Sequence, residues 1–199
     1  MGKGEFAKNA MKLMLRPFAN VYPTVRFACS HYAGEWLFGK NADFTVIPNG
    51  IELDKFQFDP VIRQETRKEL GIADDTFLIG HVGRFMPQKN QAFLVDVLAD
   101  LLPKRSNTML AFVGDGPDRL AVQQHAVELG IADHVLFLGQ RSDVNRLYQA
   151  FDVFCLPSLY EGLGMVAVEA QVAGLPCLLG DAVPLEADVT TQSHFLQIA

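Results

Sequence analysis

Short apolar runs alternate with segments of helical period from residue 43 onward, and this alternation constrains the fold more than any other feature of the chain. The apolar runs occupy residues 44–47, 77–82, 109–113, 135–138, 153–156 and 175–179, and the helical segments occupy 60–70, 88–102, 118–129, 144–150 and 165–173. Continuously apolar strands joined by helices are typical of a parallel sheet that is covered on both faces. The sequence therefore predicts a doubly wound α/β domain.

The first part of the chain does not follow this pattern. It contains a basic helix, a short strand at 24–29 and a helix at 30–39, which is too little to form a hydrophobic core of its own. At the other end, the residues after Ser193 read as the start of a further strand. We therefore expect two parts, residues 1–42 and 43–199, and both ends look cut from something larger.

The formal net charge of −6 is unevenly distributed along the chain. Residues 1–40 carry six Lys or Arg and two Glu, a balance of +4, so the remainder carries −10. An acidic body argues against nonspecific binding of nucleic acid, and we expect no nucleic-acid partner. The basic N-terminal helix, in which apolar residues are interspersed, either lies on the anionic inner membrane surface or is a solvated helix of a larger domain.

Cysteine content and hydropathy bear on the cellular compartment. The three cysteines are embedded in apolar runs, which favours buried thiols in a reducing compartment over a disulfide or a metal site. No apolar stretch reaches the roughly 18 residues that a membrane span needs. The charged N-terminus has no apolar signal region. We therefore expect a cytoplasmic protein, with peripheral membrane contact as a further option.

Two carboxylates, Glu161 and Glu169, bracket an apolar, glycine-containing segment that reads as a turn followed by a buried helix. Helical side chains lean towards the N-terminus, so Glu169 is expected to point back towards the turn that carries Glu161. The amides at the start of this helix would bind phosphate. They belong to Gly162, Leu163, Gly164, Met165 and Val166. The alternative is that Glu169 forms a structural ion pair.

Two cations follow the strand at 77–82: Arg84 at the end of the strand and Lys89 at the start of the next helix. Ligands of open α/β sheets bind beyond the carboxyl ends of the strands. Both cations can therefore converge on one anion, and a guanidinium with an ammonium suits a diphosphate. Taken alone, these residues are more simply explained as a strand-end Arg and a solvated Lys. Gly-Asp-Gly-Pro at 114–117 allows the close approach of a ligand but also fits a plain turn.

The joint order of these motifs resembles the nucleotide-binding domain of retaining glycosyltransferases with the GT-B fold, specifically glycosyltransferase family 4. Pro157-Ser158-Leu-Tyr-Glu161-Gly-Leu-Gly164 and the seven-residue gap to Glu169 resemble the E-x7-E signature of that family. Further matching segments lie at 49–56, 133–139 and 173–176. The resemblance spans residues 22 to 190 and looks closest to members that build capsular polysaccharides or exopolysaccharides. It implies that residues 43–199 are the Rossmann-like, donor-binding C-terminal half of a GT-B fold, and that residues 1–42 are a remnant of the acceptor domain.

The resemblance also implies roles for single residues. Arg84 and Lys89 would hold the donor diphosphate, Glu161 would contact the donor sugar, and Glu169 would hold the ribose hydroxyls. The loop 139–143, which includes Arg141, would lie at the base and bind it mostly through backbone. The implied reaction is glycosyl transfer from a nucleotide diphosphate sugar to a hydroxyl acceptor, a sugar or a lipid-linked sugar, with retention of the anomeric configuration. No Asp-x-Asp occurs in the chain, and no metal or cofactor is expected.

Two other functions remain open. A binding module could hold a nucleotide sugar without transferring anything alone, because the chain supplies only the donor half of the cleft. A GT-B-fold sugar epimerase would need acid/base groups in the cleft, and the spacing of Glu161 and Glu169 favours the transferase. A dehydrogenase is disfavoured because no Gly-x-Gly-x-x-Gly follows the first strand. His81, inside a strand, is interpreted as a satisfied core residue and not as a base.

Overall fold

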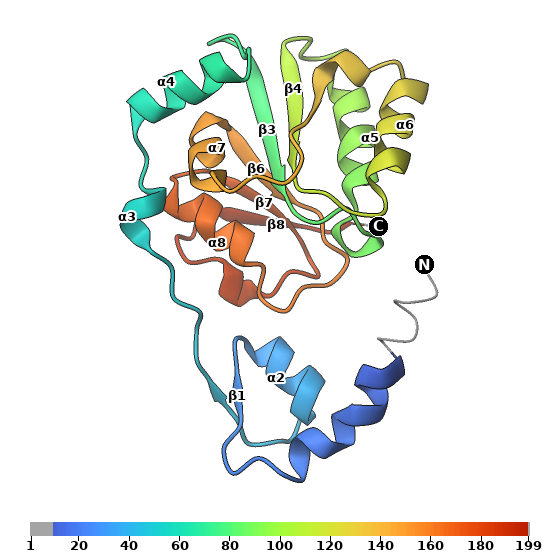
Figure 1. The fold of residues 1–199 in the computed structure, drawn as a ribbon, viewed down its shortest axis with the longest axis vertical. Coiled ribbons are helices and arrows are strands. Elements are labelled where there is room, and N and C mark those ends of the chain that lie inside the picture. The colour runs from blue at the N-terminus through green and yellow to red at the C-terminus, as the bar shows by residue number, and fades with distance from the viewer. Residues whose placement is uncertain (1–9, 199) are drawn as a thin grey trace. The chain divides into compact units, whose positions relative to one another are not determined.

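The structure is a computed structural model that describes residues 10–198. The chain divides into two compact units, residues 1–50 and 51–199, which are described separately (Figure 1). Within the described residues, no helix is long and apolar enough to cross a membrane.

In the first unit a helix packs on a small parallel sheet. Residues 10–15 are helical and continue into the 3-10 helix η1 (Arg16–Asn20). Strand β1 (Phe27–Ala28) pairs with β2 (Thr45–Val46), and α2 (His31–Phe38) connects them. The second strand thus joins the first unit, whereas the sequence pattern grouped 44–47 with the later strands.

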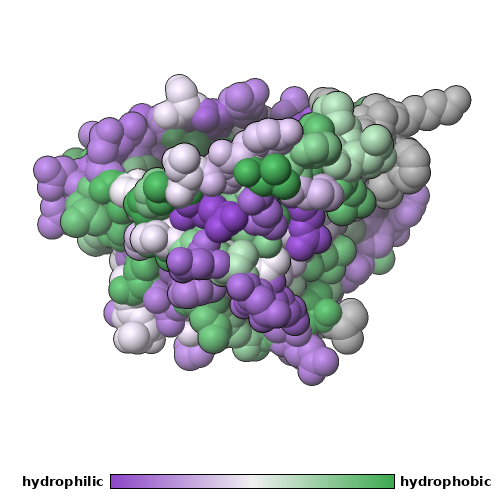
Figure 2. Space-filling view, turned by 90° about the horizontal axis from the view of Figure 1, so that it is seen from below, coloured by the Kyte–Doolittle hydropathy of each residue, from purple (hydrophilic) through white to green (hydrophobic). Residues whose placement is uncertain are grey.

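Large apolar side chains are unusually exposed in this first unit. Met14 and Tyr22 are each 76% exposed and Val21 is 69% exposed. Figure 2 shows one face of the molecule, on which apolar side chains lie among polar ones. The first unit therefore buries little of its own apolar surface, as expected for so short a segment.

The second unit is built on one six-stranded sheet in which every neighbouring pair is parallel. The spatial order of the strands is β5-β4-β3-β6-β7-β8. They are β3 (Phe77–Val82), β4 (Thr108–Val113), β5 (Val135–Phe137), β6 (Val153–Leu156), β7 (Cys177–Gly180) and β8 (Ser193–Leu196). Since β3 pairs with β6 at the centre, the order reverses there, and ligands of such sheets bind beside this switch point.

Helices cover both faces of the sheet, and each face has its own apolar core (Figure 1). The helices are α3 (Leu53–Phe56), α4 (Pro60–Glu69), α5 (Gln91–Leu101), α6 (Arg119–Glu128), α7 (Val144–Ala150) and α8 (Met165–Val172), with 3-10 turns η2 (Pro87–Lys89), η3 (Ala132–His134) and η4 (Leu185–Ala187). One core contains Leu98 of α5 and Val122 of α6. The other contains Leu147 of α7 and Ala170 of α8. The predicted doubly wound α/β fold is confirmed.

The predicted elements differ from the observed ones at a few places with clear causes. The helix expected over 88–102 begins at Gln91, because Asn90 adopts a left-handed conformation, φ 53°, that separates η2 from α5. Strand β7 begins at Cys177, after Pro176, which cannot donate to the ladder. The one-turn helix α3 was not predicted, because four residues are too few to show a helical period.

Candidate nucleotide-sugar site

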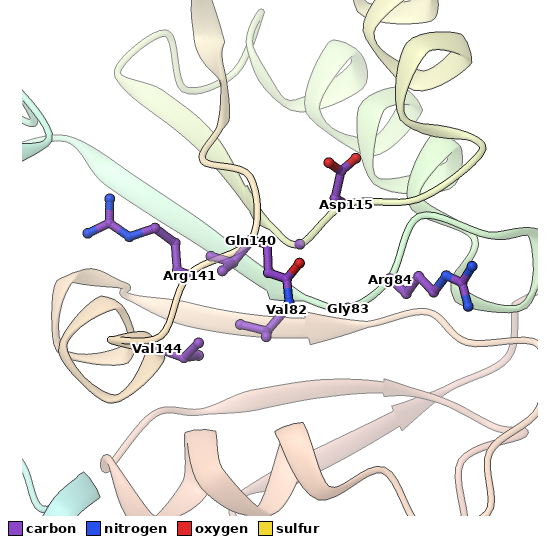
Figure 3. A pocket seen from close by; sticks show the side chains of 9 residues that line it. Val82, Gly83, Arg84, Asp115, Gln140, Arg141 and Val144 are labelled. Carbon is purple, nitrogen blue, oxygen red and sulfur yellow. The ribbon is translucent and has the colours of Figure 1, made fainter.

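A cavity of about 370 Å³ lies at the carboxyl ends of β3 and β4, beside the loop that follows β5 (Figure 3). Its lining residues are Val82, Gly83, Arg84, Val113, Gly114, Asp115, Gln140, Arg141 and Val144. They come from three loops that follow adjacent strands. This is the edge of a parallel α/β sheet at which ligands bind.

Glycine allows the loops after β3 and β4 to pack backbone against backbone. Gly114 has φ 133°, and a Cβ there would lie 2.1 Å from the carbonyl oxygen of Gly83. A Cβ at Gly116 would lie 2.2 Å from the carbonyl oxygen of Phe85. The amide of Gly114 donates to the carbonyl of Gly139 at 2.8 Å. The glycines at 114–117 therefore serve the close approach of neighbouring loops, which draws three strand ends together around the cavity.

Lys89 and Glu161 meet at this edge of the sheet, although they follow different strands. The ammonium of Lys89 donates to Oε1 of Glu161, and Ser158 Oγ donates to the same oxygen at 2.7 Å. Glu161 is buried. Two further bonds join the segments: Leu159 N donates to the Gln88 carbonyl at 2.8 Å, and the Gln88 amide donates to the Tyr160 carbonyl at 2.7 Å. The sequence predicted that both residues belong to one site, and the structure brings them into contact.

Arg84 lies at the border of the cavity, but its side chain is exposed. In Figure 3 its guanidinium extends away from Gln140. Its carbonyl accepts from the side-chain amide of the buried Gln91 at 3.0 Å, which fixes the backbone after β3. The two predicted phosphate ligands therefore differ in this structure: Lys89 is held by Glu161, whereas the Arg84 guanidinium is directed to solvent.

Glu169 on α8 is half-buried, and its partner is a hydroxyl group. The Tyr148 hydroxyl lies 2.9 Å from Glu169 Oε2 and 3.1 Å from the Val166 carbonyl, and its single proton is donated to one of them at a time. Burial raises the pKa of Glu169, and the Tyr148 hydrogen bond and the charge of Lys55 oppose this rise. Among the described residues no ion pair involves Glu169.

The turn before α8 presents a helix start without a side-chain cap. Gly164 occupies the N-cap position with φ 84°, and α8 begins at Met165. Leu163 and Gly164 are buried, while Gly162 is exposed. The first amides of an α-helix have no partner within the helix, so this geometry suits an anion or a hydroxyl oxygen.

Arg141 forms a local pair within its loop. Its Nε and Nη2 donate to the two carboxylate oxygens of Asp143 at 2.8 and 2.6 Å. This hydrogen bonding raises the pKa of Arg141 and lowers that of Asp143. In Figure 3 the Arg141 side chain points away from Val82, so what Arg141 offers to the cavity is mainly its backbone.

Known proteins resemble this chain in sequence and in fold. A family model described as glycosyl transferases group 1 matches residues 62–194. EpsF of Bacillus subtilis is 38% identical over 180 residues, which cover 88% of this chain and 47% of EpsF. The chain belongs to the group 1 glycosyl transferases. The resemblance inferred from the motifs is therefore confirmed.

Two further similar proteins carry different nucleotides in their descriptions. The GDP-mannose-dependent alpha-(1-6)-phosphatidylinositol monomannoside mannosyltransferase of Mycolicibacterium smegmatis is 33% identical, covering 82% of this chain and 43% of that protein. Among solved structures, HepE of Anabaena, in complex with UDP and glucose, superposes with a TM-score of 0.83 at 26% identity, covering 94% of this chain and 52% of HepE. The chain thus spans about half the length of the relatives it matches.

His81 is a residue whose setting the motifs of the group 1 transferase did not reveal. It lies in β3, is fully buried, and its Nδ1 is 2.9 Å from the carbonyl oxygen of Cys155. Its Nε2 is buried and has no hydrogen-bond partner among the described residues. The interpretation of His81 as a core residue is correct in its burial, but the side chain is satisfied at one nitrogen only. No sequence pattern indicates this, because the partner of each ring nitrogen depends on residues from other strands and loops.

Proposed function

We propose that the chain binds the nucleoside diphosphate of an activated sugar at the carboxyl edge of its sheet and supplies the donor half of a retaining glycosyltransferase. The observation that carries this proposal is the cluster of Lys89, Glu161 and Ser158 beside the cavity at the ends of β3 and β4. An ammonium, a buried carboxylate and an uncapped helix start together offer groups for both phosphate and sugar.

The leaving group of such a reaction is a nucleoside diphosphate on which negative charge develops. Lys89 lies at the site. Arg84 borders the cavity, and its exposed side chain can rotate towards a bound phosphate. With the amides at the start of α8, these cations would stabilise the developing charge. Positioning and charge stabilisation of this kind need no covalent step from the protein.

The two carboxylates would bind the sugar and the ribose of the donor. Glu161 would bind the sugar, since Ser158 Oγ donates to its Oε1 and holds the carboxylate in place when Lys89 turns to the phosphate. Glu169 would accept both hydroxyls of the ribose, a role that suits a carboxylate facing a cis-diol. Its half-exposed position leaves room for such contacts.

The base would lie against the loop 139–143, whose Gln140 and Arg141 line the cavity. Relatives with UDP and GDP in their names support a nucleoside diphosphate without fixing the base. The acceptor would be the hydroxyl of a sugar or of a lipid-linked sugar. The basic residues of 1–40 would favour peripheral contact with an anionic membrane, although residues 1–9 lie outside the described part of the chain.

Calorimetric titration tests this proposal. The unmodified chain should bind UDP, GDP or ADP more tightly than the corresponding nucleoside, and Arg84→Ala should weaken the best diphosphate by roughly tenfold or more. The matched control is Lys104→Ala, which removes an exposed cation. Lys104 precedes the N-terminal end of β4, whereas the cavity lies at the carboxyl end of that strand. Equal affinity of the unmodified chain for nucleoside and diphosphate would overturn the assignment.

A further inference from the structure

His81 joins the two central strands of the sheet through one ring nitrogen. A carbonyl oxygen can only accept, so the 2.9 Å contact with Cys155 requires that Nδ1 carries the proton and donates. Nε2 is therefore the acceptor nitrogen of a neutral ring. Burial lowers the pKa of His81 to about 4, with a smaller contribution from the charge of Lys89. The lone pair of Nε2 is thus available throughout the neutral range.

Nε2 lies beside Gly83, which directly follows β3. A Cβ on Gly83 would lie 3.0 Å from Nε2, and the same point lies 3.4 Å from Cδ and 3.5 Å from Cε of Lys89. The acceptor nitrogen, Gly83 and the Lys89 stem therefore share one small space at the end of β3. The edge-on contact with the Phe112 ring, at a centroid distance of 5.7 Å, holds the imidazole in this orientation.

A buried acceptor without a donor destabilises the fold, and such atoms in proteins call for an explanation. A strong donor whose stem lies beside the same point is the ammonium of Lys89, which here is turned to Glu161. Lysine has three N–H donors on a flexible stem, so rotation about its last bonds redirects the ammonium without moving the backbone.

Resting on the proposed function, we propose that His81 is a positioning residue for Lys89. When a diphosphate binds, the ammonium turns from Glu161 to the phosphate, and Nε2 of His81 accepts a hydrogen bond from one N–H group of Lys89. Glu161 is thereby released to accept a hydrogen bond from the donor sugar. The movement of Lys89 thus links binding of the diphosphate to release of the Glu161 carboxylate.

Two substitutions separate the nitrogens of His81. His81→Asn places an amide near Nδ1 and keeps the donor to Cys155, but it removes the acceptor at Nε2. His81→Gln places a carbonyl oxygen near Nε2 but loses the bond to Cys155. The proposal predicts that His81→Asn weakens UDP or GDP binding by roughly tenfold and leaves binding of uridine or guanosine unchanged. His81→Gln should bind the diphosphate more tightly than His81→Asn, even if it melts at a lower temperature.

Nitrogen NMR of the unmodified, ¹⁵N-histidine-labelled chain keeps the proposal testable if either variant fails to fold. Saturating UDP or GDP should shift the His81 Nε2 resonance in the direction of an accepted hydrogen bond, and the free nucleoside should not. An unshifted resonance, or unchanged diphosphate affinity in a folded His81→Asn variant, would overturn the role of His81. If the unmodified chain prefers no diphosphate over its nucleoside, the proposed function fails instead.

Discussion

The ammonium of Lys89 contacts the carboxylate of Glu161 across a sequence separation of 72 residues. Lys89 follows β3 and Glu161 follows β6, and these strands are neighbours at the centre of the sheet. Both side chains are largely buried, with exposed fractions of 15% and 9%. The contact joins two predicted donor ligands into one unit, so substitutions of either residue should affect both stability and binding.

Replacement of Lys89 by methionine should lower stability and affinity together. Lys89→Met leaves the Glu161 charge buried without its ion-pair partner, with the hydrogen bond from Ser158 still in place, which should cost about 3 kcal/mol of unfolding free energy. Diphosphate affinity should fall roughly tenfold to a hundredfold. Chemical denaturation and calorimetry measure the two effects on the same samples.

The double variant Lys89→Met/Glu161→Gln separates the two effects. Because it removes both charges, much of the lost stability should return, whereas the diphosphate affinity should stay low. If the double variant is no more stable than Lys89→Met, the pair does not contribute as the geometry indicates.

Glu169→Gln should discriminate between ribose and other parts of the ligand. A carboxylate that accepts both hydroxyls of the ribose loses part of this capacity as an amide, so ribonucleotide affinity should fall roughly tenfold. Affinity for 2′,3′-dideoxynucleotides should hardly change. Titration of both ligand series decides the matter: an equal loss for both would assign Glu169 a structural role beside Tyr148.

The pH dependence of stability provides a separate test of Glu169. Burial raises its pKa in the folded chain, so its contribution is fully present below the ordinary Glu pKa and is lost as pH rises through the raised value. Glu169→Gln should therefore melt at a temperature equal to or above that of the unmodified chain near pH 7, with the difference reduced at acidic pH. A Glu169→Gln variant that melts well below the unmodified chain at neutral pH contradicts this expectation.

Gly114→Ala should disrupt the cavity by forcing apart two strand-end loops. Its φ of 133° is strained for alanine, and the added Cβ would lie 2.1 Å from a carbonyl oxygen of the backbone. Destabilisation of at least about 3 kcal/mol is expected, with loss of nucleotide binding. Gly71→Ala is the matched control, since Gly71 has φ 70° but nothing within 4 Å of the added Cβ. It should cost about 1–2 kcal/mol through backbone strain alone, and similar losses in both variants would argue against a role for loop packing.

The sheet was predictable from sequence because its strands are continuously apolar and its helices are well delimited. Leu78 and Leu110 lie in such runs and are fully buried. That Arg84, Lys89 and Glu161 lie at the same edge of the sheet also followed from the rule that parallel strands end together, although the Arg84 guanidinium points to solvent.

Pairing between side chains was not predictable in the same way. The contact of Lys89 with Glu161 and the bond of Tyr148 to Glu169 depend on rotamers and on the packing of α7 against the sheet, which no local pattern encodes. The function of the glycines at 114–117 likewise depended on the loop after β3, distant in sequence. The missing hydrogen-bond partner of His81 Nε2 could be recognised only from the three-dimensional positions of the ring and of Gly83.

The structure of the chain with bound UDP or GDP is the most direct test of the central claim. We expect the diphosphate within hydrogen-bonding distance of Lys89 and Arg84 and of the amides at the start of α8, with the ribose hydroxyls on Glu169. We also expect that Lys89 has left Glu161. A nucleotide bound elsewhere, or bound at this edge with its phosphates away from both Arg84 and Lys89, would contradict the account.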